Sequence, residues 1–337
     1  MAGTPLRSVA VPQRRALLGW MAAGSLALFA GTPARGQSFP TRPVRLVVPF
    51  AAGGPADTLA RATASALATT LKEQVIVENK PGAGGNVAAA AVASSAPDGH
   101  TLLVAGQAIL AINKALYASL AYDPDRDFAW IGMMGSFPNV LVAHPEAAPA
   151  KTLAELVELA RKAPGSVSYG SNGIGSQSHL TVEVIAQVAG VKFLHVPYQG
   201  AAPQRADLLS GRIAFSFIGA STTVPLIRSG QLRALAVSTG ARVAALPEVP
   251  TLVESGYPML DTPTWFAAVA PSATPAPTLA ALRSAFAAAI ASPAYAAEMG
   301  KQAASVVAVA PAEADALLAR ERKVWSDAVR ATGASAS

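Results

Sequence analysis

The 337-residue sequence contains no cysteine, and only 14% of its residues are charged and 6% are aromatic. The absence of cysteine excludes disulfide bonds, thiolate nucleophiles and a lipid-modified cysteine. No G-x-S-x-G, H-E-x-x-H or G-x-G-x-x-G pattern occurs, and the four histidines share no metal-ligand spacing (His100, His144, His179, His195). We therefore expect no enzyme of a common class, no metal and no cofactor. An enzyme of an unrecognised kind is the weakest alternative.

The N-terminal residues have the parts of an export signal. A basic start (Arg7, Arg14, Arg15) precedes the apolar stretch Leu17 to Phe29, which is too short for a membrane anchor. Small residues before Gln37 predict a signal peptide over 1–36 that is cleaved near Gly36–Gln37, with Sec and twin-arginine export both open. This segment holds four arginines and no acidic residue, so its removal lowers the net charge of the chain from +6 to +2. The sequence therefore predicts a periplasmic protein with no nucleic-acid partner.

Three short glycine-rich turns each lead from a strand-like run into a helix-like run. The first turn is Val48 to Arg61, the second turn is Asn79 to Ala88, and the third turn is Tyr169 to Leu180. The start of a helix leaves backbone N–H groups without partners and carries a partial positive charge. Because glycine lets a small anion approach the backbone, several such turns facing one cleft would hold a carboxylate or phosphate.

Strand-like and helix-like runs alternate along the chain, which predicts an α/β protein with parallel sheets covered by helices. A strand from Asn139 to His144 is expected where the chain crosses into a second lobe, and a strand from Trp265 to Ala270 is expected back in the first lobe. This predicts lobe 1 over 37–138 and 263–337, and lobe 2 over 139–262. Ligands of open α/β sheets bind beyond the carboxyl ends of the strands, where all three turns lie.

Several motifs occur in the order that is typical of one family. They are F-P-T-R-P-V-R-L-V-V-P-F-A-A-G-G-P-A-D from Phe39, V-E-N-K-P-G-A-G-G-N, P-D-G-H-T-L-L, Y-D-P at Tyr122, S-H-L at Ser178, H-V-P-Y-Q-G at His195, L-R-A-L-A-V-S at Leu232, and L-P-E-V-P-T-L-V-E-S-G at Leu246. Together they resemble the Bug (TctC-like) periplasmic solute receptors of tripartite tricarboxylate transporters. The resemblance covers essentially the whole chain after the signal peptide. It implies a two-lobed periplasmic-binding-protein fold of type II, the Venus flytrap, with a small carboxylate between the lobes.

The resemblance also implies which residues hold the ligand. In the family, backbone amides and ordered waters near the first and third turns grip one carboxylate. The matching positions here are Ala52, Gly53, Gly54, Ala56, Asp57, Ser171, Gly173, Gly175, Ser176 and Ser178. Asp57 itself is expected to cap its helix and organise the turn.

The sequence departs from the family pattern at two places that bear on the ligand. Where many relatives carry an aspartate or asparagine pair, this chain has Ile218 and Gly219. We expect both residues to lie in the site, but their side chains cannot contact a second polar group of the ligand. Gln107 is followed by Ala108 to Ala111, where relatives have a small polar cluster. An unpaired buried polar group costs roughly 1–3 kcal/mol. The hypothesis is therefore a ligand with one carboxylate and an apolar or aromatic body.

Several further residues have two open interpretations. Ser176 and Ser178 either cap the following helix or contact the ligand. Tyr198 and Gln199 follow a strand end and are predicted to line the cleft. Arg205 and Trp265 are each either structural or in contact with the ligand.

The combined reading is a monomeric solute receptor that closes over a carboxylate and delivers it to the membrane permease subunits of a tripartite transporter. The alternative partner is a sensor kinase that reads the liganded receptor.

Overall fold

The computed structural model describes residues 1–3, 39–198, 200–301 and 304–336. The predicted signal peptide and its cleavage site lie outside these residues, as does Gln199. All the helices and strands described below belong to the unit Phe39–Ser337.

The first sheet of this unit has five strands. Their order is β2 (Val75–Asn79), β1 (Val44–Val48), β3 (Thr101–Gly106), β10 (Thr264–Pro271) and β4 (Phe128–Phe137). The strands β2, β1 and β3 are parallel, as expected from the alternation, whereas β10 runs antiparallel to both β3 and β4. The sheet is therefore mixed, which corrects the prediction of a purely parallel sheet.

The second sheet also has five strands and is mixed. Their order is β7 (Leu194–Pro197), β6 (Ser168–Ser171), β8 (Phe215–Gly219), β5 (Asn139–Ala143) and β9 (Arg233–Val237). Strand β5 is antiparallel to its neighbours β8 and β9. The chain passes from the first sheet into the second at this strand, because β4 ends at Phe137 and β5 starts two residues later. The chain then returns to the first sheet through β10.

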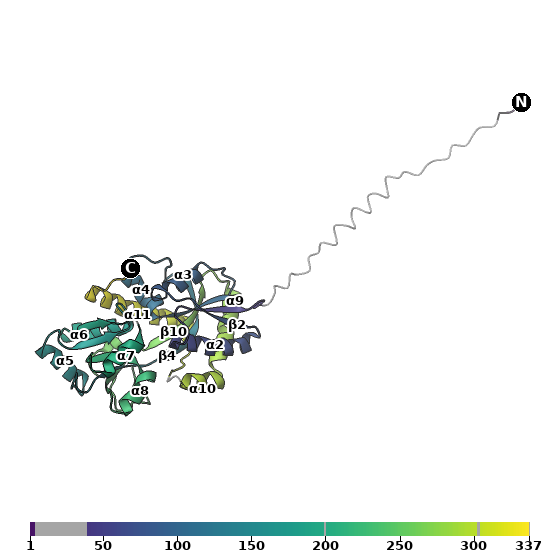
Figure 1. Ribbon diagram of the computed structural model, residues 1–337. Coiled ribbons are helices and arrows are strands. Elements are labelled where there is room, and N and C mark those ends of the chain that lie inside the picture. Colours follow the sequence, from purple (N-terminus) through teal and green to yellow (C-terminus); the bar gives the residue numbers. More distant parts are fainter. Residues whose placement is uncertain (4–38, 199, 302–303, 337) are drawn as a thin grey trace. The chain divides into compact units, whose positions relative to one another are not determined.

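Helices cover both sheets (Figure 1). Around the first sheet lie α2 (Pro55–Leu71), the short helix η2 (Ala83–Gly85), α3 (Asn86–Ala93), the π-helix η3 (Ala108–Ile112), α4 (Asn113–Leu116), α9 (Ala276–Ile290) and α10 (Pro293–Lys301). The helices around the second sheet are α5 (Leu153–Lys162), α6 (Gln177–Ala189), α7 (Ala201–Leu209), α8 (Ala220–Arg228) and the short helix η4 (Pro258–Leu260).

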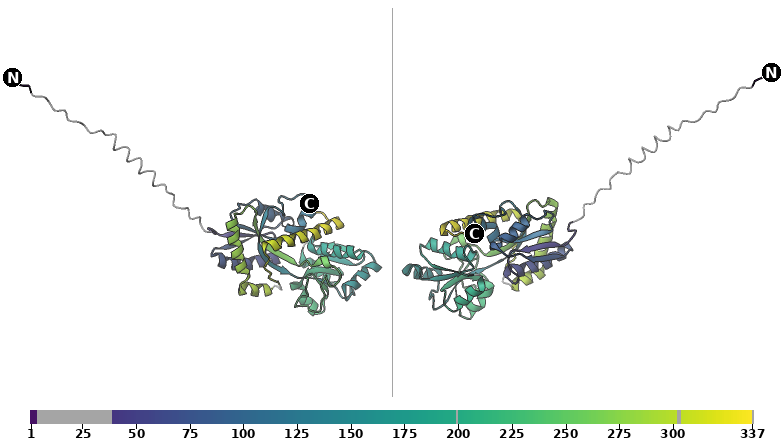
Figure 2. Two further views of the ribbon diagram at one scale, coloured as in Figure 1. Left: turned by 180° about the vertical axis from the view of Figure 1, so that it is seen from behind. Right: turned by 45° about the horizontal axis from the view of Figure 1, so that its top comes forward.

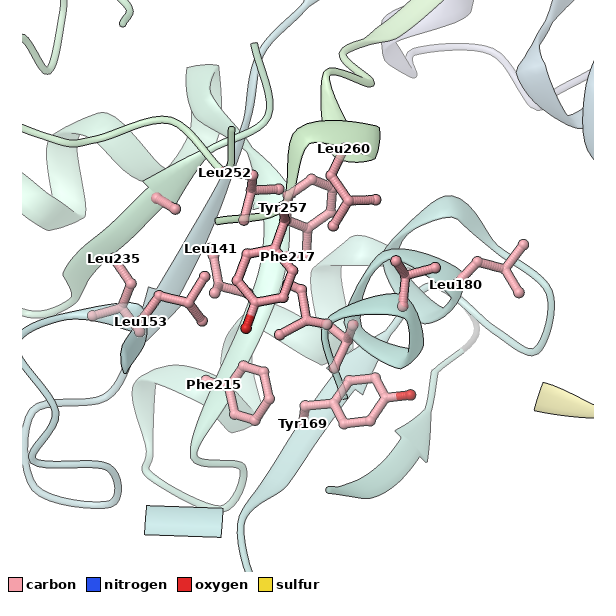
Figure 3. Close-up of a cluster of buried hydrophobic side chains, with 14 of the residues drawn as sticks. Leu141, Leu153, Tyr169, Leu180, Phe215, Phe217, Leu235, Leu252, Tyr257 and Leu260 are labelled. Carbon is pink, nitrogen blue, oxygen red and sulfur yellow. The ribbon is translucent and has the colours of Figure 1, made fainter. Parts of the chain in front are cut away.

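The last helix, α11 (Pro311–Thr332), packs against elements of both groups (Figure 2). It contacts η3 and α4 beside the first sheet and α6 beside the second sheet. Trp325 in this helix is fully buried and belongs to the same apolar cluster as Leu180 and Phe215. Figure 3 shows the part of this cluster that surrounds Phe215 and Phe217. Burial of large side chains on this scale contributes roughly 1.5–3 kcal/mol each.

Helix α5 shows how the sequence sets an element boundary. Thr152 caps the helix, because its Oγ1 accepts a hydrogen bond from the N–H of Glu155 at 3.2 Å. The Glu155 carboxylate returns to the N–H of Lys151 at 2.7 Å, one residue earlier than in a reciprocal capping box. The side chain of Thr152 therefore sets where α5 begins.

Among the described residues, no single helix is both long and apolar enough to cross a membrane. The helices α9 and α10, bent by 65° at their junction, reach the length and hydropathy of a membrane span only when the two are taken together.

Candidate functional site

The first turn is organised by a buried carboxylate. Asp57 is 3% exposed, and its Oδ2 accepts hydrogen bonds from the N–H of Gly53 at 2.9 Å and from Arg61 Nε at 3.0 Å. Its Oδ1 accepts from Arg61 Nη2 and from Asn79 Nδ2. The hydrogen bond from Arg61 lowers the pKa of Asp57 to about 2. Asp57 therefore holds the turn in shape with both of its oxygens already engaged.

Asp57 does not cap α2, which corrects the expectation from the sequence: the helix begins after Gly54 without a side-chain cap. Its first intrahelical bond is donated by Thr58 to the carbonyl of Gly54 at 3.0 Å. The N–H groups of Ala56 and Asp57 precede that bond, so they have no partner within the helix. These two main-chain donors and the positive end of the helix are among the groups that the first turn can offer an anion.

The third turn uses most of its own donors internally. The N–H of Asn172 donates to Ser178 Oγ, and the N–H of Gly173 donates to Ser171 Oγ, both at 3.1 Å. The N–H of Ser176 donates to the carbonyl of Gly173, and Ser176 Oγ caps α6 by accepting from the N–H of His179. Ser176 therefore caps α6, as one interpretation of the sequence held, whereas Ser178 does not cap the helix but accepts from Asn172 within the turn.

Two donors remain at the start of α6. The first intrahelical bond of this helix runs from the N–H of Leu180 to the carbonyl of Ser176. The N–H groups of Gln177 and Ser178 precede it and are not used by the Ser176 cap. At the start of α6 the available main-chain donors are therefore those of residues 177 and 178, whereas the N–H groups of Gly173 and Gly175 are already used.

A pair of histidines, of which His179 is buried and His195 half-buried, supports the third turn from behind. The rings of His179 and His195 stack with their centroids 4.1 Å apart. His179 Nδ1 accepts a hydrogen bond from the N–H of Gly175 at 3.1 Å, and His195 Nε2 lies 2.6 Å from Ser171 Oγ. Burial lowers the pKa of both imidazoles to about 4. Both rings are neutral at pH 7, which lets His179 act as an acceptor.

A cavity of about 120 Å³ lies where the third turn meets the crossing strand β10 and the end of β3. We call it the cleft cavity. None of its lining residues is ionisable; they are Phe50, Gly106, Gln107, Ala108, Ile109, Ile112, Gly175, Ser176, Gln177, Thr264, Trp265 and Phe266. An anion inside it would have to be held by main-chain donors and neutral side chains.

The larger hollows described elsewhere on the protein all have ionisable residues in their walls. The largest, of about 540 Å³, runs along the outer faces of α2 and α10 and includes Arg61 and Glu298. It includes the start of α10 at Ala294 and Tyr295, but no carboxyl end of a strand lines it. Because ligands of open α/β sheets bind beyond the carboxyl ends of strands, the cleft cavity is the better candidate.

A hydrogen-bond network joins the cleft cavity to the two strands that connect the sheets. Gln177 Oε1 accepts from Thr264 Oγ1, which itself accepts from Asn139 Nδ2 at 2.8 Å. Gln177 Nε2 donates to the carbonyl of Thr262 at 2.6 Å. The side chain of Gln177 thus links the start of α6 to the beginnings of both β5 and β10.

The second turn supports a wall of the cavity through close packing. An added Cβ at Gly85 would lie 3.0 Å from Ile109 Cδ1, and one at Gly84 would lie 2.8 Å from the Tyr117 hydroxyl. Ile109 lines the cleft cavity. The glycines therefore allow η3 to approach.

Of the fourteen predicted site residues, the structure places Gly175 and Ser176 on the cleft cavity. The first-turn set (Ala52, Gly53, Gly54, Ala56, Asp57) follows the lining residue Phe50 in the sequence, but none of the five lines the cavity itself. The other described residues of the predicted set do not line the cavity; they are Ser171, Gly173, Ser178, Tyr198, Ile218 and Gly219. Tyr198 donates its hydroxyl to Asp207, and Ile218 is buried in an apolar cluster of the second sheet. Whether these residues contact the ligand stays a prediction.

Sequence reasoning missed Gln177 and the apolar residues Phe50, Ile112 and Phe266. Gln177 could have been found, because it is the first residue of a helix that follows a glycine turn. Trp265, whose role was open, lines the cavity and also packs against Trp130 with ring centroids 5.9 Å apart. Within the described ranges, no cluster of histidine and acidic side chains could hold a metal ion.

Comparisons with known proteins agree on one family. Residues 59–333 match the family described as tripartite tricarboxylate transporter family receptor, TctC. The chain is 35% identical to the protein BugT of Bordetella pertussis over 303 residues, which is 90% of this chain and 93% of that protein.

Solved structures agree as well. The periplasmic binding protein BugD is 34% identical, with a TM-score of 0.74 over 88% of this chain and 99% of that chain. A protein of R. palustris solved with adipate is 32% identical, with a TM-score of 0.77 over the same shares. These neighbours confirm the expected two-lobed periplasmic-binding-protein fold. The chain belongs to the TctC family of tripartite tricarboxylate transporter receptors, and it is a solute-binding receptor rather than an enzyme.

Proposed function

We propose that this receptor binds a small organic carboxylate in the cleft cavity and delivers it to the membrane permease subunits of a tripartite transporter. One observation carries the proposal: the cavity has no ionisable side chain in its wall, yet it is bordered by the start of α6 with the unused N–H groups of residues 177 and 178. Such a site suits a single carboxylate. The adipate bound by the R. palustris neighbour supports a carboxylate ligand.

The rest of the cavity favours an apolar ligand body. Phe50, Ile109, Ile112 and Phe266 contribute large apolar side chains to the wall, and the second-sheet position Ile218 offers no polar side chain. The cavity is also smaller than the roughly 300–1,000 Å³ of drug-sized sites. We therefore propose one carboxylate on a short apolar or aromatic body, held between a lobe of residues 37–138 with 263–337 and a lobe of residues 139–262.

A calorimetric and thermal-shift panel tests the binding step. Hexanoate, benzoate, adipate and citrate are compared with hexanamide and benzamide, which keep the apolar body but lack the negative charge. A carboxylate at about 100 times its Kd should stabilise the protein by roughly 2.7 kcal/mol, whereas the amides should not bind. Tighter binding of citrate than of the monocarboxylates would contradict the proposed ligand class. Recovery of each acid unchanged after incubation separates a receptor from an enzyme.

The route after binding has two candidates. The family favours transport through permease subunits from the periplasm, to which the predicted signal peptide would direct the chain. The alternative output is a sensor kinase that reads the liganded receptor. Uptake of a labelled ligand should disappear in cells that lack the permease subunits. If uptake persists while a ligand-dependent kinase response is lost with the receptor, the sensing role holds instead.

A further inference from the structure

Gln107 is held in one orientation by groups behind the cleft cavity. It follows the last residue of β3, is 4% exposed and lines the cavity. Its amide nitrogen Nε2 donates to the carbonyl of Pro263 at 2.9 Å and to Glu321 Oε2 at 3.2 Å. Both hydrogens of the amide are therefore used on the side away from any ligand.

Glu321 is itself fixed by indole donors. It lies on α11, is 1% exposed, and accepts hydrogen bonds from Trp325 Nε1 through Oε2 and from Trp265 Nε1 at 3.5 Å through Oε1. Burial raises the pKa of Glu321, while the hydrogen bonds from Trp325, Gln107 and Trp265 oppose that rise. In either protonation state, Oε2 can accept from Gln107 when any proton sits on Oε1.

The reversed amide orientation is excluded by these partners. Turning the Gln107 amide would place its oxygen against the carbonyl of Pro263 and the carboxyl of Glu321, which are both acceptors. Two hydrogen bonds would be lost in a buried place, and the oxygens would repel one another. The amide oxygen Oε1 is thus the free end of the side chain.

This oxygen has access to the cavity. Among the described residues no donor reaches Gln107 Oε1, and it is not one of the buried polar atoms that are sealed from solvent. Of the hollows described, Gln107 lines only the cleft cavity. Around it the wall is apolar, with Ile109 and Phe266.

We infer that Gln107 selects carboxylates whose other end carries a hydrogen-bond donor, such as a hydroxyl or an ammonium group, over those that end in a second carboxylate. A hydroxyl can donate to Oε1, whereas an ionised carboxylate has only acceptors and meets the lone pairs of the amide oxygen. Glu321 acts as a positioning residue, since it fixes which amide atom faces the ligand. This inference rests on the proposed function and names the ligand class of the same site.

The test compares acids that differ only at the far end. Hexanoate, 6-hydroxyhexanoate and adipate form one series; butyrate, 4-hydroxybutyrate and succinate form a shorter one. In at least one series the hydroxy acid should bind about 3- to 10-fold more tightly than the unsubstituted acid, the range expected for one net hydrogen bond. The diacid should bind more weakly than the hydroxy acid.

A variant assigns the preference to Gln107. In Gln107→Met, which keeps the length of the side chain but removes the acceptor, the ratio of Kd values between unsubstituted and hydroxy acid should fall to about one. Gln187→Met, on the exposed side of α6, is the matched control and should keep the wild-type ratio.

Three results would overturn the inference while leaving the proposed function intact: equal Kd values within both wild-type series, a diacid that binds more tightly than its hydroxy acid, or a ratio unchanged in Gln107→Met. Because the wild-type series needs no variant, poor folding of Gln107→Met cannot hide a negative result. If none of the six acids binds, the proposed function itself fails.

Discussion

Asp57 shows how a charged residue can serve an anion site without touching the anion. Its carboxylate is engaged by Gly53, Arg61 and Asn79, so its negative charge is compensated before a ligand arrives. What remains available at this place is the main chain at the start of α2.

Replacement of Asp57 by asparagine should destabilise the protein by about 1–3 kcal/mol. One carboxylate oxygen would become an amide NH₂, which cannot accept the hydrogen bonds that N–H groups now donate to that oxygen. Carboxylate binding should weaken as well, since the turn loses its shape. Urea denaturation and calorimetry measure the two effects. The same change at the exposed Asp315 is the control and should alter neither quantity. Unchanged stability of Asp57→Asn would show that the network does not hold the turn.

A matched glycine pair separates backbone strain from packing. Gly175 and Gly165 have nearly the same positive φ, +74° and +75°. An added Cβ at Gly165 meets open space, whereas one at Gly175 would overlap the side chain of Leu116 on α4. Both alanine variants carry the left-handed strain of roughly 1–2 kcal/mol.

Gly175→Ala should therefore be less stable than Gly165→Ala by a further 1–3 kcal/mol or so, the range for overpacking. It should also lose affinity for carboxylates, since Gly175 lines the cleft cavity. Denaturation curves and calorimetry of both variants provide the comparison. Equal losses in the two variants would mean that Leu116 does not press on the third turn.

At the scale of elements, the third turn and α6 depend on neutral histidines. His179 has a folded pKa of about 4 against about 6.5 when unfolded. Between these values the unfolded chain binds more protons than the folded one, so the free energy of unfolding falls as the pH drops from 6.5 to 4. The neighbouring groups are His195, Tyr169 and Glu183, and Tyr169 donates to Glu183 at 2.6 Å.

From pH 7 to pH 5, His179 alone should remove about 2 kcal/mol of stability. Urea denaturation at the two pH values measures the loss in wild type and in His179→Gln, whose amide oxygen can accept from Gly175 but does not titrate. The variant should lose less stability over this interval. The account of the third turn fails if wild type and variant lose the same amount.

Most element positions could be predicted from the sequence, because local patterns determine them. The strands expected from Asn139 to His144 and from Trp265 to Ala270 agree with β5 and β10 within one residue at each end. Strand β4 was missed, since Gly132 and Gly135 interrupt a run without alternation. Helix α8 was missed because Pro225 lies inside it.

The direction of pairing and the free donors could not be predicted. The antiparallel placement of β10 depends on contacts with β3 and β4, which are more than 120 residues away in the sequence. The third turn looked like an open anion site because its glycines are visible in the sequence. Its internal bonds to Ser171, Ser178 and His179 are visible only in three dimensions.

At the scale of the molecule, the two sheets are tied together at two places. Gln177 links the start of α6 to Asn139 and Thr264 at the strands that connect the sheets. On another side, α11 packs against α4 and α6 at once. The cleft cavity lies between residues supplied by both sheets, so a ligand there contacts both groups of elements. Closure of the lobes around it would follow from that shared contact.

The most direct test of the central claim is an amide NMR titration of the isotope-labelled protein with hexanoate. If main-chain donors at the starts of α2 and α6 grip the carboxylate, the largest changes should occur at the N–H signals of Ala56, Asp57, Gln177 and Ser178. Hexanamide should leave these signals unchanged. Saturable changes confined to the hollow along α2 and α10, at Ser65, Thr69 and Glu298, would contradict the account.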